Sequence, residues 1–251
     1  MVLVSTVSFA PKADAYRPFT STDADVVDRG EVEIEYGHGF IRGDEKELSG
    51  PEVVVNVGLT NTLELVAEST LVLRDEDVAR GEFNPDRVEF VDTGIFLKCV
   101  FLQGSLHGVH RLTPSFGFEG GLLIPTETGK EEVGFEGFGI VSGRHNRFLY
   151  HLNVGGLIEE GHPGVLWGGI LEFPLKHDFS LRLVAEINGE SIRSGKPEHF
   201  ALGGIIWELP GGVTLDLAGR AGLSQAAFDW EVRGGMTVSF SLFLQTQVSV
   251  P

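Results

Sequence analysis

The sequence contains a single cysteine, Cys99, which excludes an internal disulfide framework and any metal site built from several cysteines. Basic residues are also scarce: 19 Lys and Arg stand against 36 Asp and Glu, so the formal net charge is −17. Because phosphate backbones are bound by cationic side chains, this balance argues against nucleic acid as a partner. No stretch of 18 consecutive apolar residues occurs, so the sequence predicts no helix that crosses a bilayer.

What the sequence has instead is a period of two. In residues 31–40 every second side chain is apolar or aromatic, and glutamates and glycines stand between them. This period indicates a β-strand with two unlike faces. The apolar face would meet the core in a soluble β-sandwich. In a membrane barrel it would meet lipid, and the acidic face would line the lumen.

The same pattern recurs along the whole chain. Strands are predicted at residues 31–40, 52–59, 63–73, 88–102, 113–124, 134–141, 148–158, 165–173, 180–188, 198–208, 213–222 and 230–240. This makes about twelve strands, an even number, as in bacterial outer-membrane barrels. The predicted fold class is therefore all-β, a transmembrane antiparallel up-and-down β-barrel of about 12 strands.

The connections between the predicted strands alternate in length. Segments 60–61, 142–146, 174–179 and 210–212 are tight, whereas segments 42–51, 74–87, 125–133 and 189–197 are longer or more charged. Segment 103–112 is a long exception on the short side. Short turns on one rim and long loops on the other favour the outer-membrane barrel, with the short turns facing the periplasm.

The two ends of the chain differ from the barrel region, which is predicted to cover residues 30–243. Residues 1–15 contain a short apolar stretch and end in Ala13-Asp14-Ala15, a pattern typical of a signal-peptidase site. Because a basic start is missing, we expect a truncated signal peptide there. Residues 16–29 are predicted to be an N-terminal periplasmic segment, and residues 244–251 a C-terminal tail.

If the apolar faces meet lipid, the opposite faces line the lumen. The predicted lumen-facing residues are Glu31, Glu33, Glu35, Glu64, Glu68, Lys98, Glu119, His151, Glu172, Arg182, Glu186, Asp216, Arg220, Glu231 and Arg233, together with Glu52 and Asn153. So many like charges cannot all be ionised in a dry interior, because uncompensated desolvation is costly. The set therefore predicts either ion pairs that hold a narrow barrel shut or a water-filled path that prefers cations. The expected pairs join Glu172 and Glu186 to Arg182 and Arg220.

The sequence predicts no catalytic, metal or cofactor site. The histidines at positions 107, 110, 145 and 177 fall on predicted turns, where we expect them to be solvated, because a metal site needs several converging ligands. Ser105 and His107 would share one side of an extended segment, as a lipid-hydrolysing barrel would require. No acidic residue is placed to orient that histidine, so we expect that the protein is not an enzyme.

Several segments resemble a known family. Arg17-Pro18-Phe19-Thr20-Ser21-Thr22-Asp23-Ala24, followed by the strand that starts at Gly30, is similar to the opening of the phenol-degradation-pathway (MetA-pathway) outer-membrane proteins, often described as transporters. Segments 57–65 and 215–223 are similar to two of their hairpins. Leu123-Ile124-Pro125-Thr126 is similar to a third motif, although Glu127 stands where Gly is usual. The resemblance covers most of residues 16–243, and it departs at the end, where the chain continues past Phe240.

The resemblance implies a barrel channel for passive or facilitated uptake of small, often aromatic or hydrophobic, compounds across the bacterial outer membrane. The expected partners are a small-molecule solute and the lipid and lipopolysaccharide of that membrane, with no cofactor and with the oligomeric state left open. Three alternatives remain at this point. They are an occluded structural or receptor barrel with an ion-paired lumen, a soluble β-sandwich binding module, and an outer-membrane lipid hydrolase.

Overall fold

The computed structural model describes residues 17–43, 46–74, 88–110, 112–127, 129–193 and 195–242, together with Ser8–Phe9. All regular secondary structure in these residues is β-strand. None of the described segments forms a helix that is long and apolar enough to span a membrane. The signal peptide expected at residues 1–15 and the tail expected at 244–251 lie outside the described residues, apart from Ser8–Phe9.

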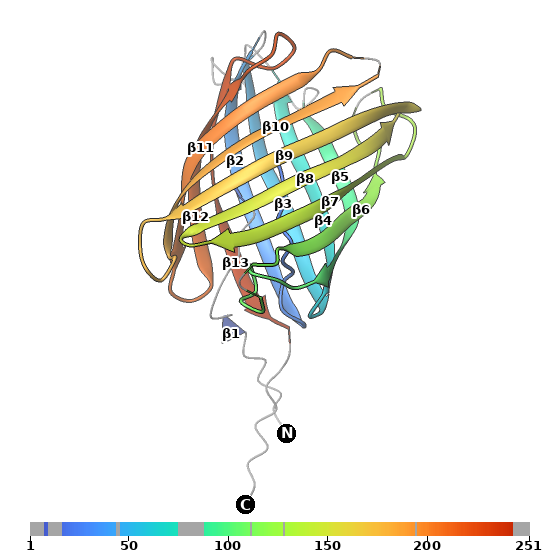
Figure 1. The fold of residues 1–251 in the computed structure, drawn as a ribbon. Helices are drawn as coiled ribbons and strands as arrows, with labels where there is room; N and C mark the ends of the chain where they lie inside the picture. The colour runs from blue at the N-terminus through green and yellow to red at the C-terminus, as the bar shows by residue number, and fades with distance from the viewer. Residues whose placement is uncertain are drawn as a thin grey trace, which may run out of the picture.

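Twelve long strands form an antiparallel meander in which each strand pairs with the next one along the chain. They are β2 (Glu31–Arg42), β3 (Lys46–Thr60), β4 (Leu63–Arg74), β5 (Val88–Leu102), β6 (Ser115–Leu123), β7 (Gly134–His145), β8 (Phe148–Glu159), β9 (His162–Pro174), β10 (Leu181–Ile192), β11 (Glu198–Leu209), β12 (Val213–Gly222) and β13 (Trp230–Ser241). β13 also pairs with β2, so the sheet closes into a barrel (Figure 1). The two-residue strand β1 (Ser8–Phe9) pairs with the end of β13.

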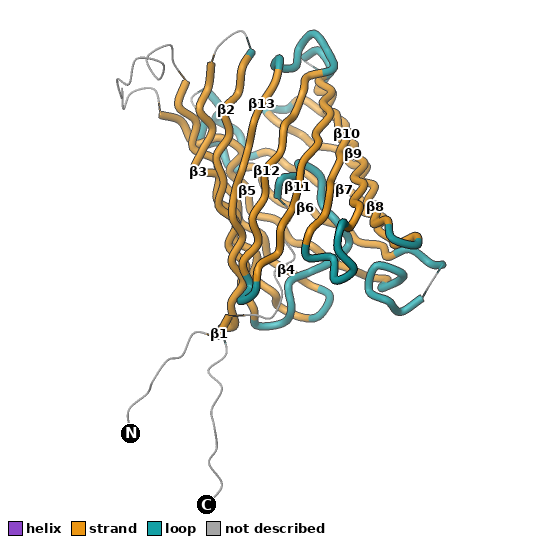
Figure 2. The backbone as a smooth tube through the Cα atoms, turned by 90° about the vertical axis from the view of Figure 1, so that its left-hand side faces the viewer, coloured by secondary structure: helices purple, strands orange, loops and turns teal. Residues whose placement is uncertain are grey.

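The predicted fold class is confirmed, and every predicted strand is present. The strand predicted at 134–141 continues to His145, because β7 pairs with β8 as far as the tight turn at Asn146. β3 begins at Lys46, inside the segment 42–51 that was expected to be a long loop. It passes through Gly50-Pro51 by shifting its register against β2 and β4. Figure 2 shows the strands running along the wall and the connections gathered at the two rims.

One connection departs from the predicted alternation of lengths. β8 and β9 are joined by the two residues Glu160 and Gly161, on the rim that was expected to carry the longer loops. Both residues have positive φ, 47° and 71°, as a type I′ hairpin turn requires. The sequence did not distinguish this turn from a longer loop, because glutamate is rare at the first position of such turns.

The wall has an apolar outer face and a polar inner face. On β5 Lys98 is fully buried inside the barrel, whereas the side chain of its neighbour Leu97 is 45% exposed on the outside. Other large apolar side chains exposed on the strands include Ile34, Leu65, Ile95, Phe118, Leu152, Val154, Leu171, Leu183, Ile187, Ile205, Leu217 and Val232. A soluble sandwich would bury this set in one interior, so the exposure of these side chains excludes that alternative. An apolar outer surface around a closed sheet is typical of a membrane-spanning barrel.

The N-terminal segment runs inside the barrel, which differs from its expected periplasmic position. Arg17 is 2% exposed and Ala24 is fully buried. The backbone nitrogens of Thr20, Thr22 and Ala24 donate hydrogen bonds to side chains of β10, β8 and β7, respectively. The period of two could not reveal this placement, because the segment is not a strand and its partners are scattered over the wall.

Part of the interior is apolar. Val184, Leu202, Ile206 and Ala218 form a buried cluster on the inner faces of β10, β11 and β12. Phe19 of the N-terminal segment packs against this cluster. The segment is therefore held by an apolar anchor as well as by its hydrogen bonds.

Candidate functional site

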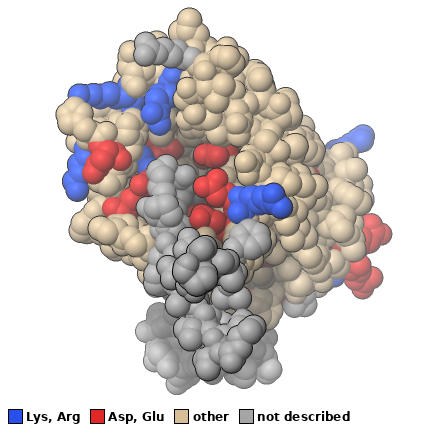
Figure 3. Space-filling model, turned by 90° about the horizontal axis from the view of Figure 1, so that it is seen from below, with Lys and Arg blue, Asp and Glu red and all other residues tan. Residues whose placement is uncertain are grey.

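The main cavity lies inside the barrel, between the N-terminal segment and the inner faces of the strands. Its volume is about 550 Å³, and its lining includes Arg17, Phe19, Glu52, Glu68 and Glu136. Seen from below, acidic side chains lie in the hollow of the barrel, and most of the outer wall is uncharged (Figure 3). The candidate functional site is therefore this interior cavity, with residues 17–22 of the N-terminal segment as one of its walls.

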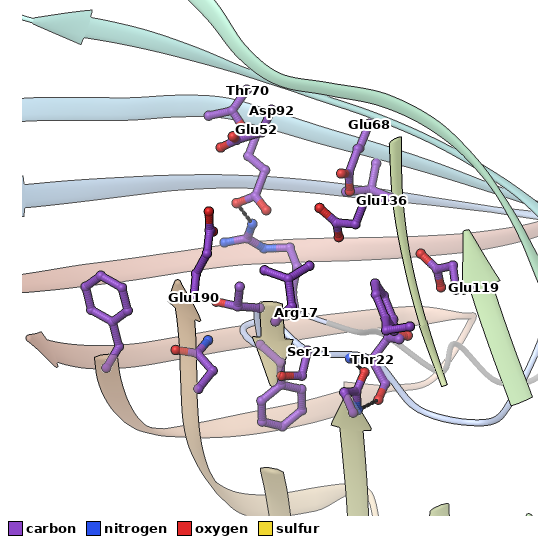
Figure 4. A pocket seen from close by; sticks show the side chains of 18 of the residues that line it. Arg17, Ser21, Thr22, Glu52, Glu68, Thr70, Asp92, Glu119, Glu136 and Glu190 are labelled. Carbon is purple, nitrogen blue, oxygen red and sulfur yellow. Dashed lines mark hydrogen bonds and ion pairs between the residues drawn. The ribbon is translucent and has the colours of Figure 1, made fainter. Parts of the chain in front are cut away.

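One charged network at the cavity binds Arg17. Its guanidinium forms an ion pair with Glu52 and another with Asp216, at 3.3 Å between Nε and Oδ2 (Figure 4 shows the pair with Glu52). Arg233 binds the same Glu52 carboxylate over 2.7 Å and approaches Glu231 at 3.6 Å. The positive charges at this level of the barrel are thus matched by carboxylates of β3, β12 and β13.

A second network lies on the inner faces of β7 to β11, outside the cavity. Arg182 Nε lies 2.8 Å from Glu172 Oε2, and its guanidinium also binds Glu208. His151 Nε2 lies 3.0 Å from the other oxygen of Glu172, and His151 Nδ1 lies 2.9 Å from the Ser142 hydroxyl. That hydroxyl accepts the backbone N–H of Ala24, so this network reaches the N-terminal segment. Arg182, Glu172, His151 and Ser142 are buried and Glu208 is nearly so, and removing one charge would leave the others unmatched.

Further contacts hold the backbone of the N-terminal segment. Glu186 accepts the N–H groups of Thr20 and Ser21 over 3.0 and 2.7 Å. Lower down the segment, Glu64 accepts the N–H of Val27. A side chain at Gly168 would collide with the hydroxyl of Ser21. The wall therefore provides both acceptors and free space along the path of the segment.

Another set of acidic side chains lines the cavity and takes no part in these two networks. These residues are Glu68, Asp92, Glu119, Glu136 and Glu190. Within the described part of the chain none of them forms a hydrogen bond or an ion pair through its carboxylate. Their carboxyl groups surround one side of the cavity (Figure 4). The cavity is therefore lined by acidic groups on that side.

The predicted lumen residues divide into two groups. Those that line the cavity are Glu35, Glu64, Glu68, Lys98, Glu119, Arg220, Glu231 and Arg233, with Glu52 and Asn153. Those that the structure places away from it are Glu31, Glu33, His151, Glu172, Arg182, Glu186 and Asp216. Most members of both groups are buried, whereas Glu31, Glu52, Glu68, Arg220 and Arg233 are partly exposed.

Two of the expected ion pairs differ from the structure. Glu172 does bind Arg182, but Glu186 binds the N-terminal segment instead of a basic side chain of the wall. Arg220 lies 3.7 Å from Glu231, and its guanidinium stacks on the ring of Phe200, 3.8 Å from the ring centre. The sequence could not predict these partners, because alternation assigns a face to each residue but no neighbour across the barrel.

Several site residues were missed by the sequence analysis. Glu136 and Glu190 alternate correctly on β7 and β10 and could have been found from their strand face. Asp92 could not, because a register shift between β4 and β5 changes the alternation beside it, and its φ of 49° is unusual for a strand. Arg17 could not be assigned to the lumen from the alternation of side chains, since it belongs to no strand.

His107 differs from the solvated turn residue that was expected. Its Nδ1 lies 2.9 Å from the Ser115 hydroxyl and its Nε2 lies 3.1 Å from Asp25 of the N-terminal segment. The hydroxyl of Ser105 accepts the N–H of Arg144. Ser115 is fully buried and accepts the N–H of Gly104, so these contacts fix the long turn between β5 and β6. Among the described residues, no group of His, Cys, Asp and Glu is placed to hold a metal ion.

A smaller cavity of about 180 Å³ adjoins the acidic side of the main one, under the loop that joins β6 and β7. Lys130 of this loop binds Glu127 at 2.8 Å and Glu159 at 2.6 Å. Partial burial by itself lowers the pKa of Lys130, but the hydrogen bonds to the two carboxylates outweigh it and raise the pKa above its usual value. Lys130 therefore stays charged and neutralises this part of the rim.

No family model matches the sequence, and no curated protein matches it. Among solved structures, the chain is similar to an outer membrane channel from Pseudomonas putida F1, with 10% sequence identity and a TM-score of 0.61 over 88% of this chain and 99% of that one. It is also similar to the KdgM porin in complex with disordered oligogalacturonate, with 10% identity and a TM-score of 0.55 over 84% and 99% of the two chains. These similarities show that the chain has the fold of outer-membrane channel barrels.

Proposed function

We propose that the protein is a channel of the bacterial outer membrane that takes up small compounds by passive or facilitated diffusion. The observation that carries the proposal is a cavity of about 550 Å³ lined by both charged and apolar side chains, enclosed by a barrel whose outer surface is apolar. A purely structural barrel needs no such space, because its interior could be filled by side chains. The resemblance to the phenol-degradation-pathway family supports the same function.

The N-terminal segment acts as a gate in this proposal. It occupies the barrel between Arg17 and Val27, and most of its contacts are hydrogen bonds and ion pairs to the wall. When the segment leaves, these groups exchange protein partners for water, so the net cost of each hydrogen bond is well below its intrinsic strength. Phe19 is its one described apolar anchor.

The gate can be tested with a disulfide. A β-carbon at Gly117 would lie 3.5 Å from the β-carbon of Ala24, within the range of natural disulfides. We suggest the double variant Ala24→Cys/Gly117→Cys in a Cys99→Ser background, studied in a planar lipid bilayer. The reduced protein should conduct, and oxidation should lower its open probability at least tenfold.

The single variant Ala24→Cys, treated with the same oxidant, controls for unspecific oxidation and should show no change. Conductance that is equal before and after disulfide formation would contradict the gate and leave the channel intact. If neither the wild type nor the reduced variant conducts, the alternative is favoured, namely an occluded structural or receptor barrel with an ion-paired lumen.

The lining also suggests what kind of solute fits. Phe19, Phe96 and Phe138 offer apolar surface beside the carboxylates, which suits a compound with an aromatic or apolar body. The KdgM porin was solved with oligogalacturonate, a polyanion. The acidic cavity of the present chain would repel such a ligand, so a similar fold serves a different solute here.

A further inference from the structure

We propose that the cavity is a binding site for small organic cations, meaning compounds with an ammonium or quaternary ammonium group on an apolar or aromatic body. The inference rests on the proposed channel function and specifies the class of its solute. Two independent features of the cavity lead to it: a buried carboxylate that forms no described hydrogen bond or ion pair, and aromatic rings that alternate with the carboxylates.

The buried carboxylate is that of Glu119. Its residue is 9% exposed, it forms no hydrogen bond or ion pair with any described residue, and it points into the cavity (Figure 4). Its cross-strand neighbour on β5, Lys98, is close enough to attract the carboxylate, but the Lys98 amino group is bound to Thr22 Oγ1 at 3.2 Å and Asp23 Oδ1 at 3.5 Å. A buried carboxylate without a hydrogen bond or a close ion pair is costly, and a bound cation would offset that cost.

The other carboxylates of this set face the same cavity. Glu68 and Asp92 approach from β4 and β5, and Glu136 and Glu190 from β7 and β10. The cations around the cavity are already engaged: Arg17 and Arg233 bind Glu52, and Lys98 binds the N-terminal segment. The groups left to face the free volume are therefore mainly acidic, which favours a cationic ligand over a neutral or anionic one.

The strand register places aromatic rings among these carboxylates. Phe96 of β5, Gly121 of β6 and Glu136 of β7 are aligned across the three strands, and Lys98, Glu119 and Phe138 form the adjacent row. A ring and a carboxylate therefore lie on opposite sides of Gly121, which adds no side chain to the space between them. An ammonium group over a ring face gains a cation–π interaction, so the ring and the acid bind the same charge together.

The site fits an organic cation better than a metal ion. No described group of carboxylates and histidines is arranged to hold a metal. The acids are spread over several strands around a volume of about 550 Å³, which falls in the usual range of small-molecule sites. A ligand with an apolar body can contact the rings while its charge remains near the carboxylates.

Binding can be measured by isothermal titration calorimetry on the purified full chain in detergent micelles. Benzylammonium is the probe, and benzyl alcohol is a neutral control of nearly the same shape. Benzylammonium should bind at least tenfold more tightly than the alcohol, and KCl at equal ionic strength should compete only weakly. Equal binding of the alcohol, or full competition by K⁺, would overturn the proposal.

Variants locate the site. Glu119→Gln and Glu136→Gln keep the shape of the side chain but remove one charge each, and each should weaken benzylammonium binding by about fivefold or more. Phe138→Leu should weaken the binding of the cation more than that of the alcohol, because only the cation uses the ring face. Glu131→Gln removes one charge from an exposed loop residue outside both cavities and should change nothing. An equal effect of Glu131→Gln would mean that only the overall charge attracts the probe.

Conductance and benzylammonium binding together separate the channel function from the class of its solute. If the reduced disulfide variant conducts but benzylammonium does not bind, the channel stands and the solute class is wrong. If benzylammonium binds as expected and no conductance is seen, the site exists in a receptor barrel. If both measurements are negative, both proposals fail.

Discussion

Arg17 and Gly37 lie against each other on the inner wall: the guanidinium of Arg17 fills the space that a β-carbon at position 37 would occupy. Gly235 of β13 pairs with Gly37 and leaves room for the same guanidinium. Glu52 and Asp216 then bind the charge. The two glycines thus leave a space in the barrel wall that the Arg17 side chain fills. The position of the N-terminal segment therefore depends on the sequences of β2 and β13.

Gly37→Val should displace the Arg17 side chain from this space and weaken the binding of the N-terminal segment to the wall. We expect a higher open probability in planar-bilayer recordings, because Glu52 and Asp216 then lose a partner and the segment loses its first anchor. The outward-facing Gly203→Val is the matched control, since a β-carbon there meets no atom within 4 Å. Unchanged gating in Gly37→Val would show that Arg17 does not hold the segment.

The network around Arg182 makes a prediction about stability. Arg182→Met would leave the buried carboxylate of Glu172 and the partly buried one of Glu208 without their shared cation. Breaking a buried ion pair on one side costs about 3–5 kcal/mol in free energy of unfolding. Urea-induced unfolding in lipid vesicles, followed by tryptophan fluorescence, measures this loss. Arg193→Met, at an exposed position beyond β10, should cost far less, and equal losses would contradict the assigned role of the network.

The barrel could be predicted from the sequence because its wall repeats one simple rule. Between Glu31 and Phe40, apolar and polar side chains alternate so regularly that both the strand and the side of the wall on which each side chain lies can be predicted. The same rule failed where the backbone departs from a regular ladder, as at Asp92, whose positive φ and adjacent register shift break the alternation.

The partners inside the barrel could not be predicted. Alternation shows that Glu186 points inward, but only the folded chain brings it to the backbone of Thr20 and Ser21, 166 and 165 residues away. Arg17 binds Asp216 from even farther along the chain. These contacts depend on how a non-repeating segment crosses the interior, and no local pattern encodes that path.

The outer face makes a prediction about membrane insertion. Leu217 lies in the middle of β12 with 57% of its side chain exposed, where it would contact lipid. Leu217→Arg should therefore lower the free energy of unfolding in a bilayer by about 2–4 kcal/mol. Leu223→Arg, at a similarly exposed leucine just beyond the end of β12, should cost clearly less. Equal costs at the two positions would place the lipid boundary elsewhere.

Cys99 provides a chemical test of the same face. It follows the inward-pointing Lys98 on β5, so its thiol points outward, toward the lipid. A membrane-impermeant, water-soluble thiol reagent should not label it in intact membranes. The control is Leu112→Cys in a Cys99→Ser background, because Leu112 is 93% exposed in the turn between β5 and β6. This cysteine should react readily once the reagent can reach that rim. Rapid labelling of Cys99 in the folded protein would contradict the outward assignment.

The carboxylates of the cavity make a prediction about ion selectivity. Glu68, Glu119 and Glu136 form no described ion pair, so in a water-filled path they attract cations and repel anions. A salt gradient across a planar bilayer, with the gate opened by Gly37→Val, should give a reversal potential of cation-selective sign. The selectivity should fall as the salt concentration rises, because the screening length shrinks from about 10 Å at 0.1 M to about 3 Å at 1 M. Glu68→Gln/Glu136→Gln should reduce the reversal potential, whereas Glu131→Gln should leave it unchanged because this residue lies outside both cavities. Anion selectivity of the opened channel would mean that ions do not pass along this set of carboxylates.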